Sequence, residues 1–156
     1  MFSDLQGIEK NPNTYPWLPS GAAAQISIFS QLMPFVTRLL YGGITEELLL
    51  RWGLMTLLAW GSWRILQKHR THPPARCFHA AILLSAVIFG AGHLPVAFFV
   101  VSEPNIALVT FVILANAAFG VIAGYLFWKR GLESAIVAHM ITHGVLLAGS
   151  RPWGYS

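Results

Sequence analysis

Acidic, basic and imidazole side chains stand inside runs of apolar sequence where ionised groups are rare. The stretch GGITEELLLRWG, residues 42–53, carries two adjacent glutamates and an arginine in a run otherwise typical of a membrane helix. Each ionised group at membrane depth costs several kcal/mol unless it is paired or hydrated, so its presence indicates a partner or a function. The ionisable residues at such depth are Glu46, Glu47, Arg51, His79, His93, His139 and His143, with Arg38 near a predicted helix end.

The two glutamates differ in the partners that the sequence offers them. Glu47 and Arg51 are four residues apart, which is one helical turn, so they can form an ion pair. We favour a structural role for this pair, because pairing is the cheapest way to keep either charge in a bundle. Glu46 has no basic residue on its own helix face. Because intramembrane carboxylates are functional by default, we predict that Glu46 is a catalytic residue or a ligand.

The histidines allow more than one interpretation. His139 and His143 in HMITH have the same four-residue spacing, so both rings project from one helix face. Hydrogen bonds within the bundle, two metal ligands and two donors to a reacting group all fit that spacing. His93 fits a core histidine as well as a site residue, and His79 fits an interfacial position. An unpaired carboxylate combined with histidines on separate apolar segments favours an acid and base site in a hydrated cavity.

The elements that must position these groups are membrane helices. Of the 156 residues, 55% are hydrophobic and only 10% are charged, a composition far from that of a soluble domain. We therefore predict an all-α fold, a polytopic transmembrane helical bundle of about five membrane helices, in one domain of residues 21–150. Residues 1–20 are expected to form a polar or interfacial segment, and residues 151–156 a short tail. The five apolar segments are 21–41, 44–66, 78–101, 106–128 and 132–149.

Glycine, proline and charged residues predict where these segments end. Gly42 and Gly43 are expected to break the chain between the first two segments. The first segment, which holds Pro34, is expected either to kink or to lie partly in the interface. The connections QKHRTHPPAR and KRG are basic whereas SEPN is acidic, so the positive-inside rule makes the basic side and the N-terminus cytoplasmic. The +4 formal charge is scattered, which argues against a nucleic-acid partner.

The fourth segment carries residues that favour helix packing. Gly120 and Gly124 form a small-xxx-small pair that permits close helix contact, and Asn116 is predicted to form an interhelical hydrogen bond. Cys77 is the single cysteine, so no intrachain disulfide can form.

Three motifs in order resemble those of the CPBP family of membrane proteases, which includes CAAX prenyl proteases and bacteriocin-processing or immunity-related proteins. EELLLR, FGAGH and HMITH are similar to the family patterns EExxxR, FxxxH and HxxxN. The resemblance covers about residues 40 to 150, and it is the three motifs together that make it specific. It implies an intramembrane endopeptidase in which Glu46 is the general base and His93 its partner in activating water. His139 and His143 would donate hydrogen bonds to the oxyanion, with Glu47, Arg51 and Phe89 in support.

The last motif departs from the family pattern, since His143 stands where many members have asparagine. Histidine can donate a hydrogen bond but can also bind metal, and Glu46, His93, His139 and His143 would be an acceptable zinc set. We favour the chemistry without a metal cofactor. The chain is also short for the family, so we expect a minimal member or one that completes its bundle as a homo-oligomer.

Two functions of other classes compete with the protease. A non-catalytic interaction or bacteriocin-immunity module would keep the motif residues as a buried polar network. A small transporter would use them as a proton relay, although no inverted repeat is evident. For the protease, the expected partners are the lipid bilayer and a peptide or protein substrate, either prenylated or a peptide precursor. The expected location is a bacterial plasma membrane, as an integral multi-pass protein.

Helix depth raises a difficulty for the predicted site. With about 1.5 Å of rise per residue, Glu46 and His93 fall toward the non-cytoplasmic half, while His139 lies about 10 Å from the cytoplasmic end of its helix. Straight helices would not bring these residues together. Convergence requires strong tilts, or helix breaks at Gly42-Gly43 and at Pro95.

Overall fold

The chain folds into five helical segments in a computed structural model, which describes residues 18–19, 21–32, 35–66 and 71–149. The described part contains no strand, so the predicted all-α bundle of about five helices is confirmed. The first segment is α2 (Ala22–Leu32). The second is a continuous rod, made of α3 (Phe35–Thr37), η1 (Arg38–Glu46), η2 (Leu48–Met55) and α4 (Thr56–Leu66). The other three are α5 (Ala75–Gly92) with α6 (Leu94–Val100), α7 (Ile106–Arg130) and α8 (Leu132–Gly149). The labels η1 and η2 denote π-helical turns.

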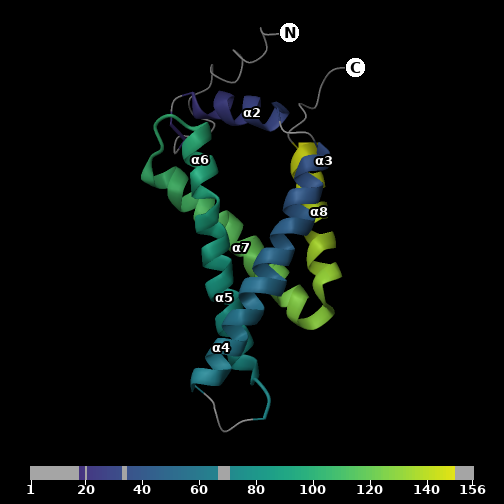
Figure 1. The fold of residues 1–156 in the computed structure, drawn as a ribbon. Coiled ribbons are helices and arrows are strands. Elements are labelled where there is room, and N and C mark those ends of the chain that lie inside the picture. The colour runs from purple at the N-terminus through teal and green to yellow at the C-terminus, as the bar shows by residue number, and fades with distance from the viewer. Residues whose placement is uncertain (1–17, 20, 33–34, 67–70, 150–156) are drawn as a thin grey trace.

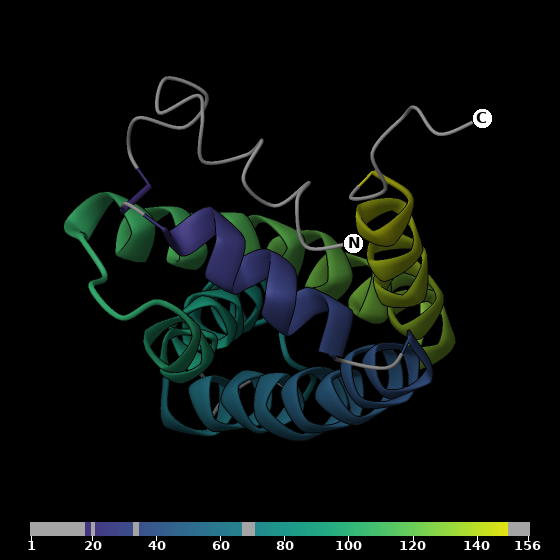
Figure 2. The same cartoon turned by 90° about the horizontal axis from the view of Figure 1, so that it is seen from above.

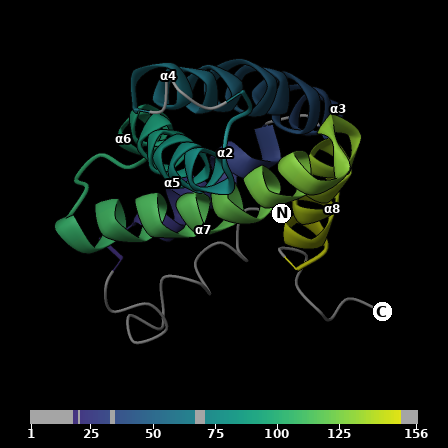
Figure 3. The ribbon, with the colours of Figure 1, turned by 90° about the horizontal axis from the view of Figure 1, so that it is seen from below.

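Four of the segments, the rod, α5, α7 and α8, are arranged around the centre of the molecule (Figures 2 and 3). The rod and α7 run along opposite sides of the molecule, with α5 between them at one end and α8 at the other, as the views from above and below both show (Figures 2 and 3). Helix α2 lies across one end of the bundle, over α6 and toward α3 (Figure 1). α5 packs most extensively against α7, while α8 contacts α7 and η1.

Small residues bring α5 and α7 together. A Cβ atom at Gly120 would lie 2.9 Å from the Cα atom of Ala86, and one at Gly124 would lie 3.2 Å from Ile82. The predicted close contact of the small-xxx-small pair is thus confirmed. Around Ile82, the helices α4, α5 and η2 share a core of Met55, Ala59, Ala81 and Ile82.

Apolar side chains also cover the outside of the bundle. Leu49, Trp52 and Trp60 on the rod are more than half exposed, as are Val87 on α5 and Leu114 on α7. Two helical stretches, Ala75–Val100 and Ile106–Arg130, are long and apolar enough to cross a membrane. Only 28% and 17% of the most apolar 18 residues of each stretch are buried inside the protein. An apolar exterior around a partly polar interior suits lipid as the surrounding solvent.

Local signals explain the helix ends near the site. Asn105 caps α7, because its side-chain oxygen accepts a hydrogen bond of 2.8 Å from the backbone N–H of Leu108. Gly131 ends α7 with a φ of 92°, which glycine adopts without a steric penalty. α5 ends and α6 begins at His93, and Pro95 lies in the first turn of α6, where its missing N–H is tolerated.

Two predictions about local structure are wrong. The helix does not break at Gly42 and Gly43, which lie inside η1, because residues of α8 pack directly on both glycines and hold the helix there. Asn116 donates to the backbone oxygen of Val112 in its own helix at 2.8 Å, rather than across to another helix. The predicted kink at Pro34, the segment 1–20 apart from residues 18–19, and the tail 151–156 lie outside the described residues.

Candidate active site

The adjacent glutamates lie where one π-helical segment ends and the next begins. Glu46 is the last residue of η1, and Leu48 is the first of η2. More residues occupy each turn of a π-helix than of an α-helix, so consecutive side chains diverge by a smaller angle. This geometry helps both neighbouring carboxylates to face the bundle interior, and π-helical turns occur frequently at functional sites.

Glu47 forms the buried centre of a charged chain. Its Oε2 atom accepts a hydrogen bond of 3.0 Å from Nε of Arg51, so the predicted ion pair is confirmed. Its Oε1 atom lies 2.8 Å from Nδ1 of His139, a contact that the sequence did not predict. The side chains of Glu47 and Arg51 are both 0% exposed. A carboxylate can only accept hydrogen bonds, so the proton on Nδ1 of His139 faces Glu47.

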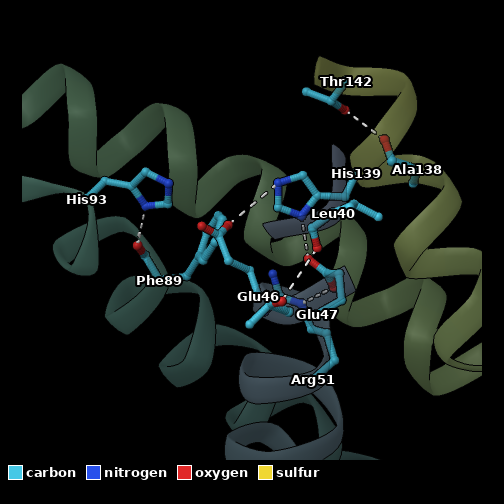
Figure 4. Close-up of polar contacts among 10 residues, drawn as sticks. Leu40, Glu46, Glu47, Arg51, Phe89, His93, Ala138, His139 and Thr142 are labelled. Carbon is cyan, nitrogen blue, oxygen red and sulfur yellow. Dashed lines mark hydrogen bonds and ion pairs between the residues drawn. The ribbon is translucent and has the colours of Figure 1, made fainter. Parts of the chain in front are cut away.

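Glu46 is more accessible than its neighbour. Its side chain is 20% exposed, and its Oε2 atom lies 3.7 Å from Nε2 of His139. His93 also interacts electrostatically with this carboxylate. Figure 4 shows the carboxylate of Glu46 between the rings of His93 and His139. The accessible glutamate is therefore the one placed between two imidazoles.

His93 is oriented by the end of α5. Its Nδ1 atom lies 2.9 Å from the backbone oxygen of Phe89, one turn earlier in the helix (Figure 4). A carbonyl oxygen only accepts hydrogen bonds, so Nδ1 carries a proton. In the neutral ring the other nitrogen, Nε2, then holds a lone pair, and a hydrogen bond of this kind is what normally fixes the tautomer of a histidine.

Aromatic rings fix the imidazole of His139 from several sides. The ring of His143 stacks on it with centroids 4.9 Å apart, which confirms that the two histidines share one helix face. The ring of Phe119 lies 4.6 Å away, and that of Phe89 meets it edge-on at 6.0 Å. The guanidinium carbon of Arg51 lies 5.3 Å from the centre of the Phe89 ring. Phe89 therefore packs beside the site as the sequence predicted.

The structure brings together all seven residues of the predicted site and leaves His79 outside it. Glu46, Glu47, Arg51, Phe89, His93, His139 and His143 lie in one cluster. His79 is exposed and meets the ring of Trp128 edge-on at 5.1 Å, outside this cluster. Sequence reasoning missed Phe119, because a phenylalanine in an apolar helix carries no signal of its own.

The alternative zinc set consists of Glu46, His93, His139 and His143. Within the described ranges, no group of three or more His, Cys, Asp or Glu side chains has a geometry that could hold a metal ion. Nδ1 of His93 faces a carbonyl oxygen, and Nδ1 of His139 faces Glu47. Nε2 is therefore the nitrogen of each ring through which a metal ion would be held.

Comparison with known proteins identifies a family. The family model described as Type II CAAX prenyl endopeptidase Rce1-like matches residues 28–145, which is more than half of the chain. No curated protein and no solved structure matches. The matched range contains every residue of the cluster.

Proposed function

Because the chain belongs to the Type II CAAX prenyl endopeptidase Rce1-like family, and is therefore a membrane protease, we propose that Glu46 and His93 activate the water that cleaves the peptide bond. The observation that carries this proposal is the partly accessible carboxylate of Glu46 between the imidazoles of His93 and His139 (Figure 4). The neighbouring Glu47 is fully buried and already paired, so it is not available as the base.

The proton moves through Glu46 in both halves of the reaction. Water donates one hydrogen bond to Nε2 of His93, whose lone pair is left free by the bond from Nδ1 to Phe89. Its second proton passes to Glu46 as the oxygen attacks the carbonyl carbon of the substrate. The carbon–nitrogen bond then breaks, and Glu46 delivers that proton to the leaving amine. A carboxylic acid and a new amine are released, and Glu46 returns to its starting state.

His139 stabilises the negative charge as it moves. With Nδ1 donating to Glu47, a second proton on Nε2 makes the ring an imidazolium that faces Glu46. The charges of Glu46, Glu47, Arg51 and His139 then sum to zero. When Glu46 takes a proton, the negative charge appears on the oxyanion, still within reach of Nε2. Fixed donors in a water-poor site stabilise such charge strongly, at about 3 to 4 kcal/mol per donor.

His143 supplies a further donor on the same helix face. The ring of His143 stacks on the ring of His139, so an N–H donor of His143 lies beside the same oxyanion. Helix α8 therefore provides the oxyanion donors, while the end of η1 and the end of α5 provide the base and its partner. This division fits an acyl-transfer site without a metal ion.

The substrate we propose is a polypeptide with a prenylated cysteine near its C-terminus, as the family description implies for its members. We propose that the protein crosses a bacterial plasma membrane several times, with α5–α6 and α7 as spans. The apolar exterior would let a prenyl chain reach the bundle from the lipid. We also propose a homo-oligomer, which cross-linking in native vesicles would detect.

A cleavage assay on purified protein in detergent tests the proposal. Short peptides with and without a C-terminal prenyl cysteine are offered to the wild type and to Glu46→Ala, with Glu103→Ala as the control for an exposed glutamate. We expect the wild type and Glu103→Ala to release product and Glu46→Ala to release none. Metal content is measured on the same samples, and added chelator should leave the rate unchanged.

The alternatives predict other results. Stoichiometric zinc, together with loss of activity on chelation, would show that the site residues coordinate zinc. For an interaction module, Glu46→Ala would change folding or partner binding, and no peptide would be cleaved by any variant.

A further inference from the structure

We infer that Gly42 is a positioning residue for the proposed active site, since the absence of a side chain there makes the space in which His143 lies. A Cβ atom at Gly42 would overlap Nε2 of His143 and lie 3.0 Å from its Cδ2 atom. The next glycine, Gly43, has the same relation to Met140, whose Cγ atom would lie 2.6 Å from the added Cβ. The His143 and Met140 side chains of α8 thus pack directly against the two consecutive glycines of η1.

Backbone conformation does not explain these glycines. Among the described residues, positive φ angles occur at Gly21 and Gly131 alone, so Gly42 and Gly43 have backbone angles that other residues adopt. Glycine inside a helix costs about 0.5–1 kcal/mol relative to alanine. The contact with α8 explains why two consecutive glycines stand in this helix, shortly before Glu46.

The position of His143 bears directly on the reacting groups. Its ring stacks on His139 with an interplanar angle of 15°, and His139 faces both glutamates. A side chain at Gly42 would push the His143 ring away from the η1 backbone and change its stacking on His139. Because Nε2 is the far end of a side chain, the ring can turn aside, so the fold can survive while the oxyanion donors are displaced.

Gly61 provides a matched control on the same rod. It lies inside α4, and a Cβ atom there would meet nothing within 4 Å. Gly42→Ala and Gly61→Ala therefore make the same chemical change on one continuous helix, with and without a neighbour in α8.

The test is a double-mutant cycle with His143→Asn, a shorter side chain that keeps an N–H donor. This cycle depends on the proposed function, since it measures peptide cleavage. We expect Gly42→Ala to lower kcat at least tenfold with KM within twofold, and Gly61→Ala to leave both unchanged. In the His143→Asn background, Gly42→Ala should change kcat by less than twofold. Equal loss in both backgrounds, or no loss in either, would overturn the inference.

A second readout does not depend on catalysis. In protein labelled with 15N-histidine, the ring signals of His143, assigned by their loss in His143→Asn, should shift in Gly42→Ala and stay in place in Gly61→Ala. Unshifted signals in Gly42→Ala contradict the inference even if cleavage is lost. If Gly42→Ala does not fold, the variant combined with His143→Asn should restore folding, and failure to do so also contradicts it.

Discussion

Glycine residues allow close contact between helices at two places in this molecule, and the two contacts have different roles. Between α5 and α7, glycines meet backbone atoms and apolar side chains, as Gly90 faces Ile113 and Gly120 faces Ala86. Between η1 and α8, glycines meet His143 and Met140 beside a network of charged groups. The first contact holds the bundle together, whereas we propose that the second positions His143 beside the proposed catalytic groups. Changes at the two contacts should therefore separate stability from activity.

The largest expected effect on stability comes from Glu47, and a change there should also lower activity. Glu47→Gln leaves the buried guanidinium of Arg51 without its counter-charge, which costs about 3–5 kcal/mol of unfolding free energy. It also replaces one of the two acceptor oxygens by an amide NH2 group and removes the negative charge that faces His139, so cleavage should fall about 10–100-fold or more, as for other orienting partners of histidine. Thermal unfolding in detergent and a cleavage assay measure the two effects.

A double variant sharpens that result. Glu47→Gln with Arg51→Met removes both charges and should recover much of the stability while cleavage stays low. Recovery of cleavage together with stability would show that the pair is purely structural.

The next effect is on stability and lies in the contact between α5 and α7. A Cβ atom at Gly90 would lie 2.5 Å from the backbone oxygen of Ile113, which cannot turn aside as a side chain can. Gly90→Ala should therefore cost about 1–3 kcal/mol of unfolding free energy. Gly61→Ala is the control and should stabilise by up to about 1 kcal/mol. A midpoint of thermal unfolding for Gly90→Ala at or above that of the wild type would disprove the packing argument.

The smallest effect is expected outside both contacts. Lys129 places its Nζ atom 3.5 Å from the centre of the Trp128 ring, at the exposed end of α7. Lys129→Met should cost about 0.5–1 kcal/mol, the usual size of an exposed cation–π interaction, and should leave cleavage unchanged. A tenfold fall in cleavage would show that this end of the bundle takes part in the reaction.

Residues four apart on one helix were predictable from the sequence, and contacts between helices were not. The Glu47–Arg51 pair and the shared face of His139 and His143 follow from spacing within a single helix. The bond between Glu47 and His139 joins residues 92 positions apart, and only the fold brings them together.

The wrong prediction at Gly42 has a physical cause. Consecutive glycines signal a break when only the local chain is considered, because glycine lowers helix stability. In the folded chain, α8 packs against them and the helix continues as η1.

The predicted depth mismatch is likewise absent, since Glu46 lies 3.7 Å from His139 even though the helix is not broken at the glycines. Crossing of the helices at an angle brings the residues together (Figure 1).

The measurement that tests the central claim most directly is the cleavage rate of Glu46→Gln beside Glu103→Gln and the wild type, on samples with matched thermal unfolding. Glutamine keeps the size of the side chain and removes its capacity as a base, and general acid–base catalysis contributes about 10²–10⁴-fold to a rate. The account predicts a loss of at least that size in Glu46→Gln and none in Glu103→Gln. Cleavage by Glu46→Gln within tenfold of the wild type would contradict it.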